Sequence, residues 1–333
     1  MFKNILVPLD GSDLAEGVFP HVRTMAAAFG ARVTLLHVSK APSQTAVDPL
    51  DWHLHKAEAA AYLREQVQHL QTAGVPVDSR LLEGPVAERI VEYADQQQSD
   101  LIILSTHGAG GASDWNVSHI AQKVLQRGVT SILLVHAGQT RTGIAGQLRY
   151  RHILVPLDGS RRAECVLPVA ARLAEQAEAD LLLAHVTTRP VIFNRLTVTE
   201  TEKAAGKWLI DHNRARAADY FEELAPRIHA NVQTALPVGD SVALELHRLV
   251  ADEAIDLVLF SAHGQTSHTQ WVYGSVVSNF IANGSAPLLV VQDLPRLSEQ
   301  QPHRQFTPRQ ALQGIPHGVS VIDNGQKRHP TSS

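Results

Sequence analysis

The sequence has a single cysteine, Cys165, among its 333 residues, so the chain cannot form an internal disulfide bond. A chain without disulfides suits a reducing compartment, and we expect a cytoplasmic protein. It also has no run close to the roughly 18 apolar residues that a membrane-spanning helix needs. The first apolar run, residues 5–9, is too short for the core of a secretory signal peptide. We therefore expect no membrane partner.

Aromatic residues make up only 5% of the chain and charged residues 19%, with a formal net charge of −4. That charge balance gives no sign of a surface for nucleic acid, so none is expected as a partner. Hydrophobic residues account for 44%, which is enough for two ordinary cores in a chain of this length. The composition therefore predicts a soluble globular protein.

Motifs typical of several nucleotide-dependent enzymes are missing. The sequence has neither a Walker A motif nor a Rossmann glycine fingerprint, and it lacks the Ser-Gly-Gly signature of adenylating PP-loop enzymes. Its 18 histidines form no His, Cys and carboxylate set at zinc-binding spacing. We therefore predict no metal site and no catalytic residues, with at most slow ATP hydrolysis.

The sequence contains an internal duplication of one whole domain. Residues 5–12, Ile-Leu-Val-Pro-Leu-Asp-Gly-Ser, return letter for letter as residues 153–160. Further on, residues 100–108 match residues 256–264, and the offset rises from 148 to 156. The extra residues fall most naturally in a longer helical stretch over 199–226. A period this long is the length of a whole domain. The predicted organisation is a first domain over 1–140, a linker over 141–150, a second domain over 151–295 and a flexible tail over 296–333.

The apolar pattern within each half alternates between two kinds of segment. Short, nearly continuous apolar runs are typical of strands covered on both faces, and longer stretches with apolar residues three and four apart are typical of helices. This alternation predicts two tandem, doubly wound α/β domains, each with a five-stranded parallel sheet. The expected strands are 5–9, 33–38, 101–104 and 132–135, then 153–157, 181–186, 257–260 and 288–291; the expected helices of the first half are 14–29, 52–73 and 86–97.

Two repeated motifs should meet in space. Open α/β sheets bind ligands at the carboxyl ends of the strands where the strand order reverses, which here involves the first and fourth strands. The first strand of each half is followed by Asp10 or Asp158, and the fourth by a Ser-x-His-Gly sequence that ends in Gly108 or Gly264. A plain turn role would also explain either aspartate.

The second half adds a helix that begins at Gly274-Ser275. The N-terminus of a helix offers unpaired N–H groups and the positive end of the helix dipole, which suit a phosphate. The alternative is that these residues only cap the helix.

Together these residues resemble the universal stress protein family in its tandem form, over about residues 3–292. ATP-binding members carry an aspartate after strand one and the pattern Gly-x2-Gly-x9-Gly-Ser/Thr after strand four. The second half reads Ser261-x2-Gly264-x9-Gly274-Ser275, which departs only at the first position. The resemblance implies an adenine nucleotide alpha hydrolase-like fold with strand order 3-2-1-4-5. It also implies that Asp158 contacts the ribose or adenine side, that Val186 meets the adenine edge, and that Gly264, Gly274 and Ser275 hold the phosphates.

The first half departs further from the family pattern. Its counterpart reads Ser105-x2-Gly108-x9-Ser118-His119, so both the last glycine and the hydroxyl residue after it are changed. Asp10, Val38 and Gly108 remain there as candidate nucleotide contacts. We expect nucleotide binding mainly in the second domain.

Several roles of the site stay open at this point. The expected ligand is ATP, ADP or AMP, with Mg²⁺ because no cationic side chain follows Gly264 in the loop. His263 and His268 could act as bases, although a histidine beside a glycine turn is more often structural. For Trp115 and Trp271 the preferred interpretation is that they pack the loop, and the second is that they stack on a ligand.

The leading hypothesis is a non-enzymatic stress-response regulator that binds nucleotide. The alternatives are a nucleotide-free scaffold or small-molecule carrier, and a slow ATPase. The last strand of each half should lie at a sheet edge, which is usually covered. Edges of this kind pair domains in the family, so the resemblance implies that the two halves form a pseudo-dimer, with a further homodimer as an option.

Overall fold

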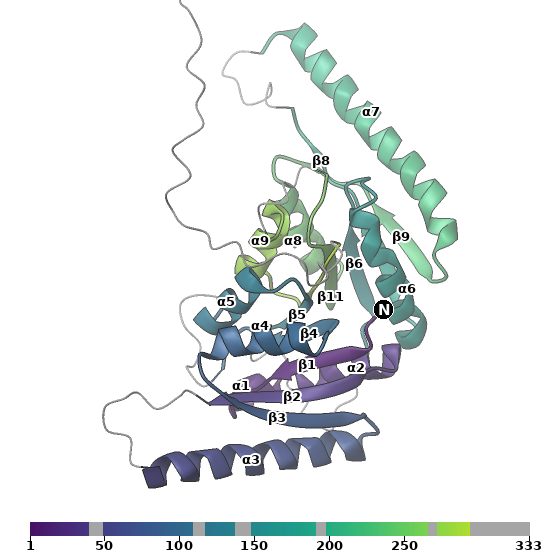
Figure 1. Cartoon of the computed structure of the whole chain (residues 1–333). Coiled ribbons are helices and arrows are strands. Elements are labelled where there is room, and N and C mark those ends of the chain that lie inside the picture. Colours follow the sequence, from purple (N-terminus) through teal and green to yellow (C-terminus); the bar gives the residue numbers. More distant parts are fainter. Residues whose placement is uncertain (40–48, 109–116, 137–147, 191–197, 266–271, 294–333) are drawn as a thin grey trace, which may run out of the picture. The chain divides into compact units, whose positions relative to one another are not determined.

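The computed structural model describes residues 1–39, 49–108, 117–136, 148–190, 198–265 and 272–293. Within them the prediction of two tandem α/β domains, each with a five-stranded parallel sheet, is confirmed (Figure 1). The first domain has the strand order β3-β2-β1-β4-β5. Its elements are β1 (Asn4–Pro8), α1 (Asp13–Glu16), α2 (Phe19–Phe29), β2 (Arg32–Ser39), α3 (Pro49–Thr72), β3 (Val77–Glu83), α4 (Val86–Gln96), β4 (Leu101–Ser105), α5 (His119–Arg127) and β5 (Ser131–Val135).

The second domain repeats this order as β9-β7-β6-β11-β12. A separate two-stranded parallel sheet of β8 and β10, which the apolar pattern does not predict, extends it. The elements are β6 (His152–Pro156), η1 (Ala163–Val166), α6 (Leu167–Ala177), β7 (Asp180–Ala184), β8 (Thr187–Thr188), α7 (Glu200–Leu224), η3 (Ala225–Arg227), β9 (Asn231–Ala235), β10 (Val238–Gly239), α8 (Val242–Asp252), β11 (Leu257–Ser261), α9 (Ser275–Asn283) and β12 (Leu288–Val291).

Two helical expectations are wrong in detail. The segment 14–29 forms two helices, because α1 ends at Gly17 and Pro20 stands in the first turn of α2, where its missing N–H costs nothing. The extra residues of the second half do not lengthen its long helix, since α7 has 25 residues and α3 has 24. They lie in the loops and short elements around α7.

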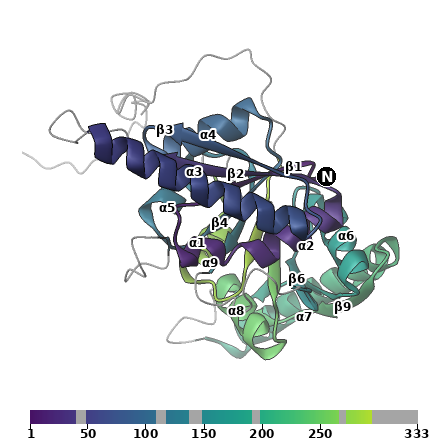
Figure 2. The same ribbon diagram turned by 90° about the horizontal axis from the view of Figure 1, so that it is seen from below.

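The buried residues of the sheets form two clusters, one on each face. Val7 belongs to the cluster that packs under α2, α3, α6 and α7, whereas its neighbour Leu6 belongs to the cluster under α4, α5, α8 and α9. Successive side chains of a strand point to opposite faces, which explains the nearly continuous apolar runs. Figures 1 and 2 show α3 lying along β2 and β3 on one face.

The two sheets join through their last strands. β5 pairs with β12 in antiparallel register, with Leu133 opposite Leu289, so ten strands form one continuous sheet. The backbone N–H of Gln292 also donates to the hydroxyl of Ser131, at 3.1 Å. The apolar edge strands β5 and β12 therefore cover each other. Among the described helices, none combines the length and the apolar character needed to cross a membrane.

Candidate functional site

The second domain contains a cavity of about 440 Å³ at the carboxyl ends of β6, β7 and β11. This is where an open α/β sheet is expected to bind a ligand. Residues that follow these strands meet the first turn of α9 and two side chains of α8 there. All seven residues predicted for the second-domain site line this one cavity: Asp158, Val186, Ser261, His263, Gly264, Gly274 and Ser275.

One wall of the cavity is apolar. Val242 and Leu246 of α8 and Phe260 of β11 line it together with Ala184 and Val186. Apolar lining of this kind suits an aromatic ring, because burying the ring removes apolar area from water.

The backbone of Val186 is directed toward the cavity side. The Ala184 carbonyl accepts a hydrogen bond from the Leu157 N–H after β6, at 2.9 Å, whereas the His185 N–H donates to Ala235 on the opposite side, at 3.0 Å. Backbone groups of successive residues in a strand alternate between the two sides. Val186 therefore presents its N–H and C=O on the side of β6, beyond the point where that strand has ended.

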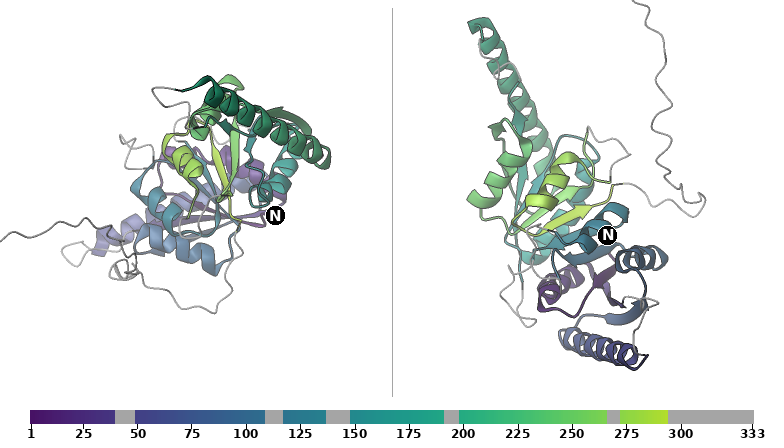
Figure 3. Two further views of the ribbon diagram at one scale, coloured as in Figure 1. Left: turned by 90° about the horizontal axis from the view of Figure 1, so that it is seen from above. Right: turned by 90° about the vertical axis from the view of Figure 1, so that its left-hand side faces the viewer.

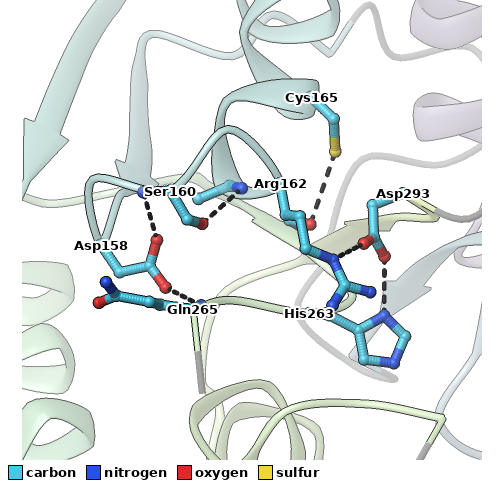
Figure 4. A network of polar contacts seen from close by, with 9 residues as sticks. Asp158, Ser160, Arg162, Cys165, His263, Gln265 and Asp293 are labelled. Atoms are coloured by element: carbon cyan, nitrogen blue, oxygen red, sulfur yellow. Dashed lines mark hydrogen bonds and ion pairs between the residues drawn. The ribbon is translucent and has the colours of Figure 1, made fainter. Parts of the chain in front are cut away.

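Asp158 is held by the loops on either side of it (Figure 4). One carboxylate oxygen accepts the Ser160 N–H at 3.0 Å, and the other accepts the Gln265 N–H at 2.6 Å. Burial acts to raise the pKa of Asp158, but the hydrogen bonds from Ser160 and Gln265 outweigh it, so the pKa lies below its usual value. The carboxylate is therefore ionised at neutral pH and retains acceptor capacity for a ligand hydroxyl.

Gly264 is required by the position of this carboxylate. A Cβ on Gly264 would overlap Oδ2 of Asp158, and a Cβ on Gly108 would overlap Oδ2 of Asp10 in the same way. The repeated aspartate and the repeated glycine therefore fit each other in both domains. This contact explains why the two halves share both residues.

The N-cap residue of α9 differs from its counterpart in the first domain. Gly274 is the N-cap residue of α9, with φ −66° and ψ 161°, and no side chain caps the helix. Any residue adopts these angles, so the backbone does not demand glycine. Residues 274–278 line the cavity, which places the uncapped helix N-terminus against it.

In the first domain the same position is occupied by a serine. Ser118 has nearly the same backbone angles, φ −63° and ψ 155°, but its hydroxyl accepts the Ala121 N–H of α5 at 3.3 Å. Both N-cap residues also bond the chain after the fourth strand, Ser118 to Thr106 and Gly274 to Ala262. The loops therefore close alike, and the first-domain helix has its N-terminus occupied by its own cap.

The other first-domain candidates remain in comparable positions. Asp10 accepts the N–H and the hydroxyl of Ser12, at 3.1 and 2.6 Å. The Leu36 carbonyl accepts the Leu9 N–H, so the alternation of the strand directs the backbone of Val38 to the β1 side, as at Val186. His268, Trp115 and Trp271 lie outside the described residues.

A network of His263, Asp293 and Arg162 lies beside the cavity, and the sequence analysis did not predict it (Figure 4). Nδ1 of His263 lies 2.7 Å from one oxygen of Asp293, and Nε of Arg162 donates to the other oxygen at 2.6 Å. The side chains of His263 and Asp293 are each 2% exposed. When the two halves are aligned by their repeat, Leu14 and Ala137 stand where the second half has Arg162 and Asp293. The residues of this network therefore occur in the second half alone. That difference between the repeats was the available signal.

Ser261 and Cys165 meet beside the same cavity. The Cys165 thiol donates to the Ser261 hydroxyl at 3.5 Å, and burial raises the pKa of the thiol above its usual value. A raised pKa disfavours the reactive thiolate. In the part of the chain that the structure describes, no group of three or more His, Cys, Asp or Glu side chains is placed to hold a metal ion.

Comparisons with known proteins agree on one family. The family model described as "Universal stress protein family" matches residues 1–136 and again residues 149–292. A universal stress protein of Thermus aquaticus is 30% identical over 136 residues, which cover 40% of this chain and 99% of that protein. One from Mycolicibacterium smegmatis is 22% identical over 299 residues, 86% of this chain and 96% of that protein.

A solved structure has the same tandem extent. The crystal structure of a universal stress protein from Archaeoglobus fulgidus superposes with a TM-score of 0.63 and 14% identity, covering 87% of this chain and 96% of that one. At this identity the likeness shows the fold.

Proposed function

Because the chain belongs to the universal stress protein family, we propose that it is a stress-response regulator that binds an adenine nucleotide in the cavity of its second domain. The observation that carries this proposal is one cavity that joins an apolar wall to an uncapped helix N-terminus. These are the two features that a purine base and a phosphate require.

The cavity suggests how the ligand lies. The base would pack between Val186 and the α8 residues Val242 and Leu246, with its polar edge at the Val186 backbone. The ribose hydroxyls would reach Asp158. The phosphates would lie at Gly264, Gly274 and Ser275, where the uncapped first turn of α9 lines the cavity.

The charge of the lining favours binding over hydrolysis. Among the described residues that line the cavity none is Lys or Arg, and Arg162, which lies beside the cavity, is paired with Asp293. Phosphoryl transfer needs cationic stabilisation of the transferred group. We therefore propose a non-enzymatic protein. Mg²⁺ would be bound mainly by the phosphates and water, with the Ser275 hydroxyl as a candidate protein oxygen ligand.

The second domain is the preferred site because of the N-cap. The Ser118 hydroxyl occupies an N–H group at the start of α5 that a phosphate would use in the second domain. The first domain keeps Asp10 and the exposed backbone direction at Val38, which would allow a nucleoside without firm phosphate binding. We further propose that the protein is cytoplasmic, that the β5–β12 pairing makes the two halves a pseudo-dimer, and that a homodimer also forms.

The test is calorimetric titration of the full chain with ATP, ADP and AMP in Mg²⁺, after chromatography of nucleotide released from denatured protein. One tight site is expected, and Gly274→Val should lower affinity at least about 100-fold, because position 274 lines the cavity and the added bulk competes with the phosphates, while the backbone angles suit valine. The matched control Ser118→Ala, at the same place in the first domain, should leave affinity unchanged. Protein without nucleotide and without heat on titration would instead support a scaffold or carrier, and phosphate release that depends on Gly274 would support a slow ATPase.

A further inference from the structure

The N-terminal part of α7 carries an exposed stripe with an apolar centre, which the nucleotide site does not use. Trp208 is 65% exposed and Leu209 is 40% exposed, and the His212 ring stacks on Trp208 with centroids 5.1 Å apart and planes at 5°. Adjacent exposed apolar side chains of this size form a contiguous apolar surface, which is a candidate for contact with another protein surface. The stripe consists of Thr201, Ala205, Trp208, Leu209, His212 and Arg216, all exposed.

These residues share one side of the helix. Their spacing is i, i+4, i+7, i+8, i+11 and i+15, which places all six on one side of a helix, with the apolar residues Ala205, Trp208 and Leu209 at the centre. The residues that α7 buries against its own domain, Gly206, Ala217, Phe221 and Leu224, lie on another side. Figure 3 shows the N-terminal turns of α7, in teal green, extending past the sheet of the second domain. The stripe therefore faces away from the core that holds the helix.

The stripe is symmetric about its own midpoint between Trp208 and Leu209. If two copies pack antiparallel about a twofold axis there, Trp208 meets Leu209, and the small Ala205 meets the larger His212 of the other copy. Thr201 meets Arg216. A twofold interface must be complementary to itself, and this arrangement places large residues against smaller ones at each level. We propose that α7 is the dimerisation helix of this protein, and that its partner is a second copy of the same chain.

Charge supports the same register. Glu202 lies next to Thr201 at one end of the stripe, and Arg216 lies at the other end. In the antiparallel arrangement Arg216 of each copy reaches Glu202 of the other, so two opposite charges meet at each end. Thr199 and Glu202 form a capping box that fixes the start of the helix, which positions this carboxylate. A parallel arrangement would instead bring like charges together.

The size of the stripe sets the expected affinity. It covers 16 residues, or about 24 Å of helix. One helix pair of this length is smaller than a standard stable interface, so the dimer should dissociate over a micromolar range. The interface is separate from the nucleotide cavity, and its test does not depend on nucleotide binding.

Sedimentation velocity of the full chain from about 2 to 200 μM tests the proposal. Wild-type protein should pass from one-chain mass, 36.3 kDa, toward twice that mass. The variant with Trp208→Ser and Leu209→Ser should remain at one-chain mass, because it loses the centre of the stripe. The matched control Leu244→Ser removes an exposed leucine of α8 and should behave as wild type.

Cysteine crosslinking in a Cys165→Ser background tests the geometry. Leu209→Cys should form a disulfide between copies under oxidation, because the twofold axis passes between residues 208 and 209 and the two copies of position 209 are one residue apart along the helix. Thr201→Cys lies on the same stripe but about 22 Å from its own copy in the antiparallel pair, far beyond disulfide reach. Wild-type protein that stays at one-chain mass to 200 μM overturns the proposal. A dimer insensitive to the serine pair, or crosslinking of Thr201→Cys as strong as that of Leu209→Cys, overturns it equally.

Discussion

At the residue scale, the contact between an aspartate and a glycine explains what the duplication has kept. Asp158 and Gly264 lie against each other in the second domain, and Asp10 and Gly108 do so in the first. The family resemblance assigns Gly264 to phosphate binding, and the structure adds a second constraint on the same position. A glycine is needed at this place even in a domain whose helix N-terminus is capped.

Substituting this glycine by alanine in each domain separates the two roles. Gly264→Ala and Gly108→Ala should each lower the free energy of unfolding by about 1–3 kcal/mol, because the added Cβ displaces the carboxylate and its hydrogen bonds. Urea denaturation measures this loss. Only Gly264→Ala should also weaken nucleotide binding in a calorimetric titration. Equal loss of binding in both variants would show that the first domain carries an equivalent site.

At the scale of the element, two helices that start with nearly the same backbone angles differ in whether a side chain caps them. α5 and α9 begin with nearly the same backbone angles and with the same bond to the chain after the fourth strand. The Ser118 hydroxyl satisfies an N–H group of α5, whereas α9 begins with Gly274 and keeps its N–H groups available. A helix N-terminus serves either its own cap or a ligand.

Exchanging the N-cap residues of α5 and α9 should therefore change which domain binds nucleotide. Gly274→Ser should stabilise α9 by at most a few tenths of a kcal/mol, because serine and glycine are close in N-cap preference. It should lower nucleotide affinity at least about tenfold, since the new hydroxyl competes for the N–H groups. The reverse change, Ser118→Gly with His119→Ser, should raise the calorimetric stoichiometry above one site per chain. Unchanged affinity of Gly274→Ser would place the phosphates elsewhere.

At the scale of the whole molecule, buried contacts join the two domains. Besides the β5–β12 pairing, Nδ1 of His21 on α2 lies 2.6 Å from the hydroxyl of Tyr150, which precedes β6. Tyr150 is fully buried and His21 is 3% exposed. Burial lowers the pKa of His21 to about 4. The junction between the domains thus contains a histidine that must remain neutral in the folded protein.

Stability should therefore depend on pH in the range set by this histidine. The unfolded chain binds a proton at His21 below its ordinary pKa of about 6.5, whereas the folded protein resists protonation down to about 4. The free energy of unfolding should fall as the pH is lowered from 6.5 to 4, by up to about 3 kcal/mol from this residue. His21→Gln keeps a partner for Tyr150 and should flatten that slope in urea denaturation series. A slope identical to that of wild type would assign the pH dependence to other groups.

Local patterns in the sequence determined much of this protein. The repeat, the buried strands and the motifs after the first and fourth strands predicted the fold and a set of residues that do line one cavity. They did so because burial on both sheet faces leaves continuous apolar runs, and because parallel strands bring their carboxyl ends to one edge. The edge strands β3 and β9 were not located, since each is partly exposed and has a mixed polar sequence.

Only the tertiary structure decided the features that depend on distant residues. Arg162 and Asp293 are 131 residues apart in the chain, and their ion pair exists because β6 and β12 end on the same side of one sheet. The fit of Gly264 to Asp158, 106 residues apart in the chain, likewise follows from how the backbone is placed in space. The periodicity of apolar residues shows which side of a helix or strand is buried. It does not show which distant residue packs against that side, because packing of the whole fold decides this.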